Sequence, residues 1–260
     1  MLRRGTLVLP RMPAALPHPR LSRRTLVVGL AGAVVLALAY VAARETPFFA
    51  VRTVEVAGAS PEVDAQVRAA LASAVGTSLV ALDAADVEAR VDAIPWVRTA
   101  RADRAFPHTL SVRVRLERAL AVIRDGERAW LVSETGRVLT EMEPSARARL
   151  PRIRTEPVGP LRVGRTIADG AVRTTLSVVR AIPPRFPERV LYADVAGGSA
   201  TLVLRGGVEL RLGPPQDAAP KLRAAAAVLA ALERDEREAI AYVDVSVPEH
   251  TVVGKRSTWT

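Results

Sequence analysis

The sequence predicts an α+β protein with an N-terminal transmembrane helix, a small β-α-α-β-β domain and then a β-rich domain with one antiparallel or mixed sheet and flanking helices. Three observations support this prediction. Residues 25–43 carry no charge, residues 51–117 switch between strand and helix periodicities, and the rest is mostly short apolar runs between Gly and Pro. A chain of 260 residues, 49% of them hydrophobic, is long enough to build two such domains.

The uncharged segment 25–43 (TLVVGLAGAVVLALAYVAA) predicts a membrane anchor. As a helix it is roughly 28 Å long, close to the thickness of a bilayer's hydrocarbon core. Basic residues before a span stay in the cytoplasm, so the chain after residue 43 is expected to be extracytoplasmic. The residues expected to set this orientation are Arg20, Arg23 and Arg24.

A cleaved signal peptide is the alternative for the same segment, because residues 37–39 and 41–43 resemble small-residue cleavage sites. The apolar run is longer than the usual signal core of about 7–15 residues, which favours the anchor. Phe48 and Phe49 follow closely and are candidates for the membrane–water boundary, or alternatively for the start of a packed strand.

The net charge of +10 is concentrated at the N-terminus. Six arginines and no acidic residue lie in residues 1–24, whereas residues 45–260 nearly balance, with 30 basic against 27 acidic side chains. With an aromatic content of only 4%, this distribution argues against nucleic-acid binding and fits a cytoplasmic flank beside a membrane.

The first exported unit has well-marked elements. Residues 51–56 read as a strand, Ser60 caps a helix that runs to Gly76, and Asp83 caps a second helix that stops at Pro95. Strands follow at 97–104 and 110–117, the latter with strict alternation of apolar and polar residues. Two helices on one face of three strands make a self-sufficient layer pair.

The remainder, residues 119–253, is predicted to be mainly strands. A proline-rich stretch at 144–160 reads as loop, and helical stripes occur at 172–179 and 222–232. The predicted strands lie at 121–123, 130–132, 138–139, 190–195, 200–204, 208–212 and 241–247.

These motifs resemble a known family. Residues 54–58, 94–97, 104–112 and 117–118 look like a POTRA domain, and more narrowly like that of FtsQ/DivIB, a bitopic bacterial cell-division family. The β-rich part is similar to the second domain of that family at 130–132, 136–139 and 242–245. The chain departs from the family pattern at Phe106, Leu120, Ser133 and Ser246, where members often have Trp, Pro, Asp and Arg.

The resemblance implies a function and a domain plan. It implies a single-pass divisome scaffold at the septum that binds FtsB (DivIC) and FtsL, acts indirectly on FtsW and FtsI, and supports septal peptidoglycan synthesis. Another POTRA-containing export component and a membrane-anchored enzyme are the alternatives. The expected segments are a basic tail 1–24, the anchor 25–43, a POTRA domain 47–118, a β domain 119–253 and a tail 254–260.

A catalytic or metal site is not predicted. Without cysteine, the only extracytoplasmic imidazoles are His108 and His250, which lie far apart in the sequence, and no cofactor motif is present. Function is therefore expected to come from contacts with other proteins.

The predicted contact surface is the strand 241–247, because a strand with no later partner lies at a sheet edge and can accept another strand. Family resemblance also implies partner binding by this C-terminal region, and the POTRA sheet offers a second edge. The residues assigned to partner binding are Tyr242, Val243, Asp244, Val245, Ser246, Val247 and Pro248.

Overall fold

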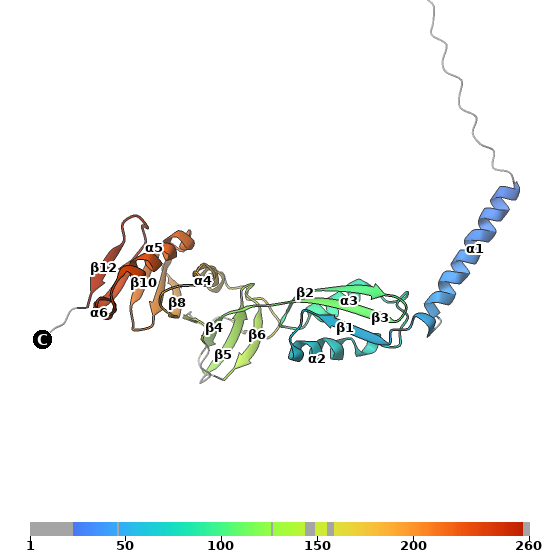
Figure 1. Ribbon diagram of the computed structural model, residues 1–260, viewed down its shortest axis with the longest axis horizontal. Coiled ribbons are helices and arrows are strands. Elements are labelled where there is room, and N and C mark those ends of the chain that lie inside the picture. The colour runs from blue at the N-terminus through green and yellow to red at the C-terminus, as the bar shows by residue number, and fades with distance from the viewer. Residues whose placement is uncertain (1–22, 46, 126, 144–148, 155–158, 257–260) are drawn as a thin grey trace, which may run out of the picture.

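The computed structural model describes residues 23–45, 47–125, 127–143, 149–154 and 159–256. Figure 1 shows them as a row: helix α1 (Arg23–Glu45), a first domain on a small sheet, and a second domain on a larger sheet. The α+β class predicted from the sequence is confirmed.

The first domain surrounds a three-stranded sheet in the order β1-β3-β2, with β1 parallel and β2 antiparallel to β3. Both α helices bury valines in one core with this sheet, so they cover the same face. The predicted caps are confirmed, because Ser60 accepts from the Val63 amide and Asp83 from the Ala85 amide. The elements are η1 (Pro47–Phe49), β1 (Thr53–Ala57), α2 (Pro61–Ala70), η2 (Ala72–Ala74), α3 (Ala84–Asp92), β2 (Val97–Ala105) and β3 (Thr109–Leu116).

The second domain has a nine-stranded mixed sheet in the order β12-β11-β10-β9-β8-β7-β4-β5-β6. The short β7 pairs in parallel with both β4 and β8 and joins the two halves of the sheet. The elements are β4 (Ala119–Asp125), β5 (Arg128–Ser133), β6 (Val138–Met142), β7 (Arg152–Arg154), α4 (Gly170–Arg180), β8 (Val190–Ala196), β9 (Ser199–Leu204), β10 (Glu209–Gly213), α5 (Ala218–Ala231), α6 (Arg234–Ala239), β11 (Ile240–Asp244) and β12 (Val252–Lys255).

Helices α4 and α5 cover one face of the larger sheet. The apolar residues of this face continue from strand to strand, with Ala193, Leu202, Leu210 and Val243 in one buried cluster with both helices. The opposite face carries polar and aromatic side chains, among them Tyr192 and Tyr242. Along β8–β11, one face of the sheet therefore forms the core while the other remains partly accessible.

The structure differs from the sequence-based prediction in four details. The first helix ends at Ala70 and continues as the 3-10 turn η2 instead of running to Gly76. β7 lies inside the predicted loop 144–160, and α6 is a separate helix whose Glu233 and Glu236 form a capping box. β12 reaches Lys255, inside the predicted tail.

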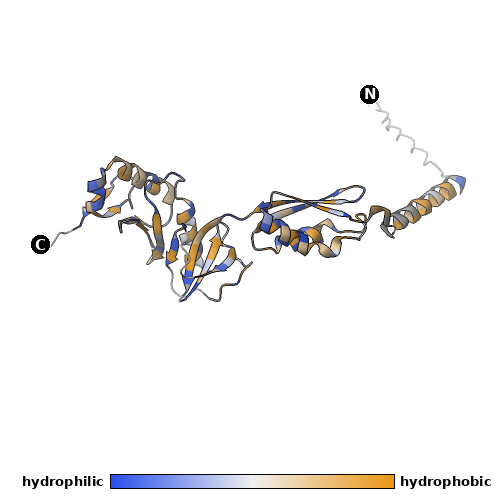
Figure 2. Cartoon of the chain, turned by 60° about the horizontal axis from the view of Figure 1, so that its bottom comes forward, coloured by the Kyte–Doolittle hydropathy of each residue, from blue (hydrophilic) through white to orange (hydrophobic). Residues whose placement is uncertain are grey.

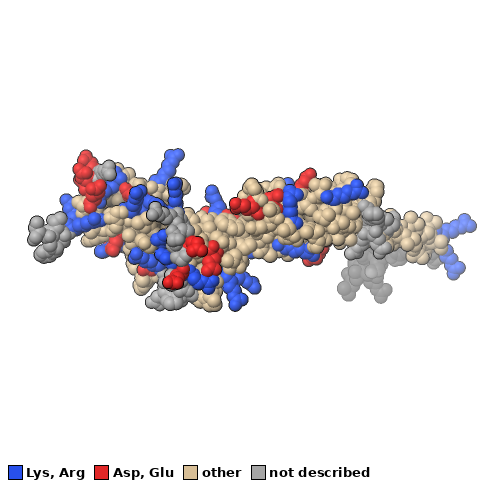
Figure 3. Space-filling model, turned by 90° about the horizontal axis from the view of Figure 1, so that it is seen from below, with Lys and Arg blue, Asp and Glu red and all other residues tan. Residues whose placement is uncertain are grey.

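Helix α1 has 23 residues and is apolar along most of its length in Figure 2. In the part of the chain that the structure describes, no helix combines the length and hydropathy needed to cross a membrane. The predicted anchor includes positions 25, 39, 42 and 43, whose side chains lie outside the described residues. Arg23 and Arg24 are exposed at the start of α1, and Figure 3 shows basic side chains at the free end of this helix. Arg20 lies outside the described residues.

Candidate partner-binding edge

The predicted edge strand is not at the edge. β11 pairs in parallel with β10 on one side and antiparallel with β12 on the other, so its backbone is occupied on both sides. The sequence reading failed because it took β11 as the last strand, whereas β12 follows after a connection of seven residues, 245–251. The edge strand on this side of the sheet is β12, and β6 forms the opposite edge.

The seven assigned residues separate into two groups. The side chains of Val243 and Val245 are fully buried in the core beneath α5, so they cannot contact a partner. The others are at least partly accessible on the open sheet face or in the β11–β12 connection, and Val247 is 50% exposed. This accessible group is Tyr242, Asp244, Ser246, Val247 and Pro248.

β12 presents outward-facing backbone groups at alternate residues. The Arg256 amide donates to the Ala239 carbonyl at 2.8 Å, so position 256 faces β11. Because N–H and C=O directions alternate along a strand, Gly254 and Val252 also face β11, while Val253 and Lys255 face outward. Among the described residues, no side chain caps these outward groups. The side chains of Val252 and Val253 are 54% and 39% exposed.

Tyr242 fixes β12 on the sheet. It lies opposite Gly254, and a Cβ at Gly254 would overlap the Tyr242 ring, so only glycine leaves room for this contact. On its other side the ring packs under the Arg211 guanidinium, 4.0 Å from the ring centroid. The sequence analysis assigned Tyr242 to partner binding, and its contact with Gly254 depends on β12, a strand that was not predicted.

Asp244 shapes the chain where it leaves β11. Its Oδ1 accepts a hydrogen bond from the Ser246 amide at 2.9 Å, a local turn that Asp readily forms. This backbone hydrogen bond, together with the Ser246 side chain and the nearby Arg211 charge, lowers the pKa of Asp244. The carboxylate is therefore ionised at neutral pH and holds the start of the connection to β12.

The edges of the first domain's sheet are capped by side chains. On β2, the Ala100 amide donates to Asp92 Oδ1 at 2.6 Å and the Ala102 amide to Glu88 Oε1 at 3.0 Å, both from α3. On β1, Arg68 Nη1 donates to the Val54 carbonyl at 2.6 Å. The second edge expected from the sequence is thus partly occupied by the protein itself.

Arg137 joins the two domains. Its guanidinium donates to the carbonyls of Val97 and Asp92 in the first domain, both at 2.7 Å, and to that of Gly164 in the second at 3.0 Å. The neighbouring Glu117 is buried and accepts from Thr135 at 2.7 Å. This joint was not predicted from the sequence, because the partners of Arg137 are backbone carbonyls distant from it along the chain.

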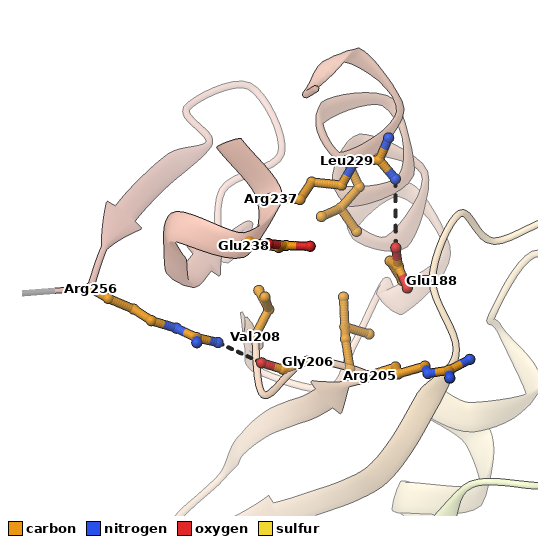
Figure 4. A pocket seen from close by; sticks show the side chains of 9 residues that line it. Glu188, Arg205, Gly206, Val208, Leu229, Arg237, Glu238 and Arg256 are labelled. Atoms are coloured by element: carbon orange, nitrogen blue, oxygen red, sulfur yellow. Dashed lines mark hydrogen bonds and ion pairs between the residues drawn. The ribbon is translucent and has the colours of Figure 1, made fainter. Parts of the chain in front are cut away.

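A pocket with a volume of about 850 Å³ lies beside the end of β12 (Figure 4). Two of the arginines that line it have local partners: Arg256 donates to the Gly206 carbonyl, and Arg237 Nη1 lies 3.5 Å from Glu188 Oε1. His108 and His250 do not line it. In the described part of the chain, no group of three His, Cys, Asp or Glu side chains could hold a metal ion.

The three-stranded sheet with two helices on one face is the arrangement of a POTRA-type domain, and a second domain on a nine-stranded mixed sheet follows it. Residues 49–116 match the family model "POTRA domain, FtsQ-type", and residues 121–246 match "Cell division protein FtsQ/DivIB, C-terminal". The chain belongs to the FtsQ/DivIB family of cell-division proteins.

Individual relatives agree. The chain is 33% identical over 142 residues to the cell division protein FtsQ of Caulobacter vibrioides NA1000, an alignment covering 55% of this chain and 43% of that protein. It is 27% identical over 209 residues to FtsQ of Agrobacterium fabrum, covering 79% and 61%. With FtsQ of Mycolicibacterium smegmatis it shares 32% over 161 residues, covering 61% and 46%. These alignments span less than two thirds of each relative's length.

Proposed function

We propose that this protein is a membrane-anchored divisome scaffold that binds FtsB (DivIC) and FtsL at the septum and, through them, supports septal peptidoglycan synthesis by FtsW and FtsI. The proposed role is to hold partners together and includes no catalytic step. Membership of the cell-division family supports a role at the division site. The open edge of β12 supports binding by addition of a partner strand.

The proposed anchor is α1, with its N-terminal end in the cytoplasm and both domains outside. Its described apolar side chains are exposed on all sides of the helix, which is typical of a helix that needs an apolar surrounding. The exposed Arg23 and Arg24 at its start fit the cytoplasmic side. The exposed apolar side chains of α1 include Leu26, Val27, Val28, Leu30, Val34, Val35, Leu36, Leu38 and Val41.

The proposed binding mode is addition of a partner strand to β12, and the observation that carries it is the uncapped outward face of Val253 and Lys255. Main-chain hydrogen bonds would provide affinity, and the exposed Val252, Val253 and Val247 would provide apolar contacts. Lys255 and Arg256 would favour a partner segment with acidic side chains.

The anchor adds to this binding. Partners tethered in the same membrane are held at a high effective concentration, so a strand of only four residues can support a stable complex. Accordingly, we place the function in positioning partners close to the membrane surface.

A proline at Val253 tests the proposal. Val253→Pro removes one outward N–H but no bond to β11, so the domain should fold while capture of the FtsB–FtsL ectodomains by the full chain falls at least tenfold. Val253→Thr keeps the amide and should bind nearly normally. Unchanged capture by a folded Val253→Pro protein would exclude strand addition at β12.

A further inference from the structure

Exposed large apolar side chains outside α1 are concentrated in few places. Three of them, Val247, Val252 and Val253, belong to the β12 region, and Val163 lies by the domain joint. The other three lie at the end of the first domain nearest α1, and the sequence analysis named one of them, Phe48, as a candidate for the membrane–water boundary. They are Phe48, Val75 and Phe106, which are 65%, 51% and 56% exposed.

Three segments come together at this end of the first domain. Phe49 packs edge-on against both Phe48 and Phe106, with ring centroids 5.0 Å and 5.5 Å apart. The loop that carries Val75 is attached to the same place, because the Gly76 amide donates to the Val51 carbonyl and the Leu79 amide to the Phe49 carbonyl. We name this surface the aromatic tip and define it as residues 47–52, 75–79 and 104–109.

The aromatic tip is next to the C-terminal end of α1. Only residue 46 separates α1 from η1, and Figure 1 shows the turn between β2 and β3 beside this end of the helix. If α1 spans the bilayer, its C-terminal end lies at the outer headgroup region. Phe48 and Phe106 then lie at the depth that aromatic side chains prefer in membrane proteins.

The charge of the aromatic tip also fits a membrane surface. Its charged residues are Arg52 and Arg104, both exposed, and its sequence contains no Asp or Glu. Exposed apolar groups with a basic rim suit anionic phospholipids, whose headgroups attract arginine while the interface accepts aromatic rings.

We propose that the aromatic tip inserts into the outer headgroup region of the membrane that anchors the chain. The first domain would then be held at a fixed tilt on the bilayer instead of swinging on the short link after α1. This inference rests on the proposed anchor. The predicted occupant of the surface is phospholipid, not a second copy of the chain.

The absence of cysteine makes a site-specific test straightforward. The full chain would be reconstituted in vesicles of phosphatidylethanolamine and phosphatidylglycerol, with one environment-sensitive fluorophore on an introduced cysteine. Quenching by lipids that carry a nitroxide at the headgroup or deep in the acyl chain reports the depth of each position. Phe106→Cys and Val75→Cys report the tip, Val35→Cys reports the middle of α1, and Val163→Cys is an exposed apolar control in the second domain, beside the domain joint.

We expect headgroup nitroxides to quench positions 106 and 75 several-fold more than position 163, and deep nitroxides to quench position 35. Quenching at 35 but not at 106 or 75 would overturn the tip contact and leave the anchor intact. No quenching at 35 would show that the anchor itself is wrong. A signal at 106 that rises with protein density but not with lipid quencher would assign the tip to a second copy and also overturn the proposal.

Discussion

The two sheets differ in whether side chains occupy the hydrogen-bonding groups of their edge strands. In the first domain, carboxylates of α3 take up the outward amides of Ala100 and Ala102 on β2. In the second domain, β12 leaves the corresponding groups of Val253 and Lys255 without a cap among the described residues. The β2 edge is therefore protected against pairing with another strand, whereas the β12 edge is available for it.

This contrast indicates where strand addition can occur at low cost. A partner that pairs with β2 must first displace Asp92 and Glu88 from their hydrogen bonds, whereas a partner at β12 displaces only water. The short length of β12 and the charge of Lys255 restrict nonspecific pairing without closing the edge.

Removing the carboxylates that accept from the β2 amides should lower the free energy of unfolding most. The double variant Glu88→Ala, Asp92→Ala leaves two amides without protein acceptors and should lower the free energy of unfolding by about 2 kcal/mol, about 1 kcal/mol for each amide. It should also increase self-association through β2. Chemical denaturation and analytical ultracentrifugation measure the two effects. Asp86→Ala removes a carboxylate of the same helix that caps no strand amide, and should leave the protein monomeric.

A substitution that crowds the Tyr242 ring against β12 should lower the free energy of unfolding by an intermediate amount. Gly254→Ala introduces a methyl group where the Tyr242 ring lies, so the ring must move off β12 and the unfolding free energy should fall by about 1.5 kcal/mol. Faster amide exchange in β12 would accompany this loss. Gly170→Ala is the control, because a Cβ there meets nothing within 4 Å and lies in a helix. Equal stability of both variants would argue against the Tyr242 contact.

Removing the Asp244 side chain should lower the free energy of unfolding least, and by an amount that depends on pH. Its folded pKa is lowered from 3.8, so its contribution is present above about pH 4 and is lost as pH falls through the folded pKa. Asp244→Ala should therefore cost about 1 kcal/mol near pH 7, and the difference from the parent protein should narrow at about pH 3. Urea denaturation at both pH values checks this, and a gap that widens in acid would contradict it.

Local signals predicted much of the fold. Ser60 and Asp83 act as caps through their side chains, and the alternation at 110–117 places Leu110, Val112 and Val114 in the core. Such features depend on neighbours in sequence, which is why pattern and propensity suffice for them.

Long-range pairing was harder to predict. β7 has only three residues in a proline-rich stretch and exists because β4 and β8 supply partners on both sides. β12 is nearly as short, with four residues. The missed signal was Val252 and Val253, which begin a return strand after the turn near Pro248. Missing it moved the predicted edge by one strand and assigned the buried Val243 and Val245 to a partner surface.

Amide hydrogen exchange, resolved by residue on the full chain with and without the FtsB–FtsL ectodomains, is the most direct test of the central claim. The account predicts that partner binding slows exchange at the outward amides of Val253 and Lys255, while Ala100 and Ala102, already bonded to carboxylates, change little. Unchanged exchange in β12 together with new protection on β2 would contradict it.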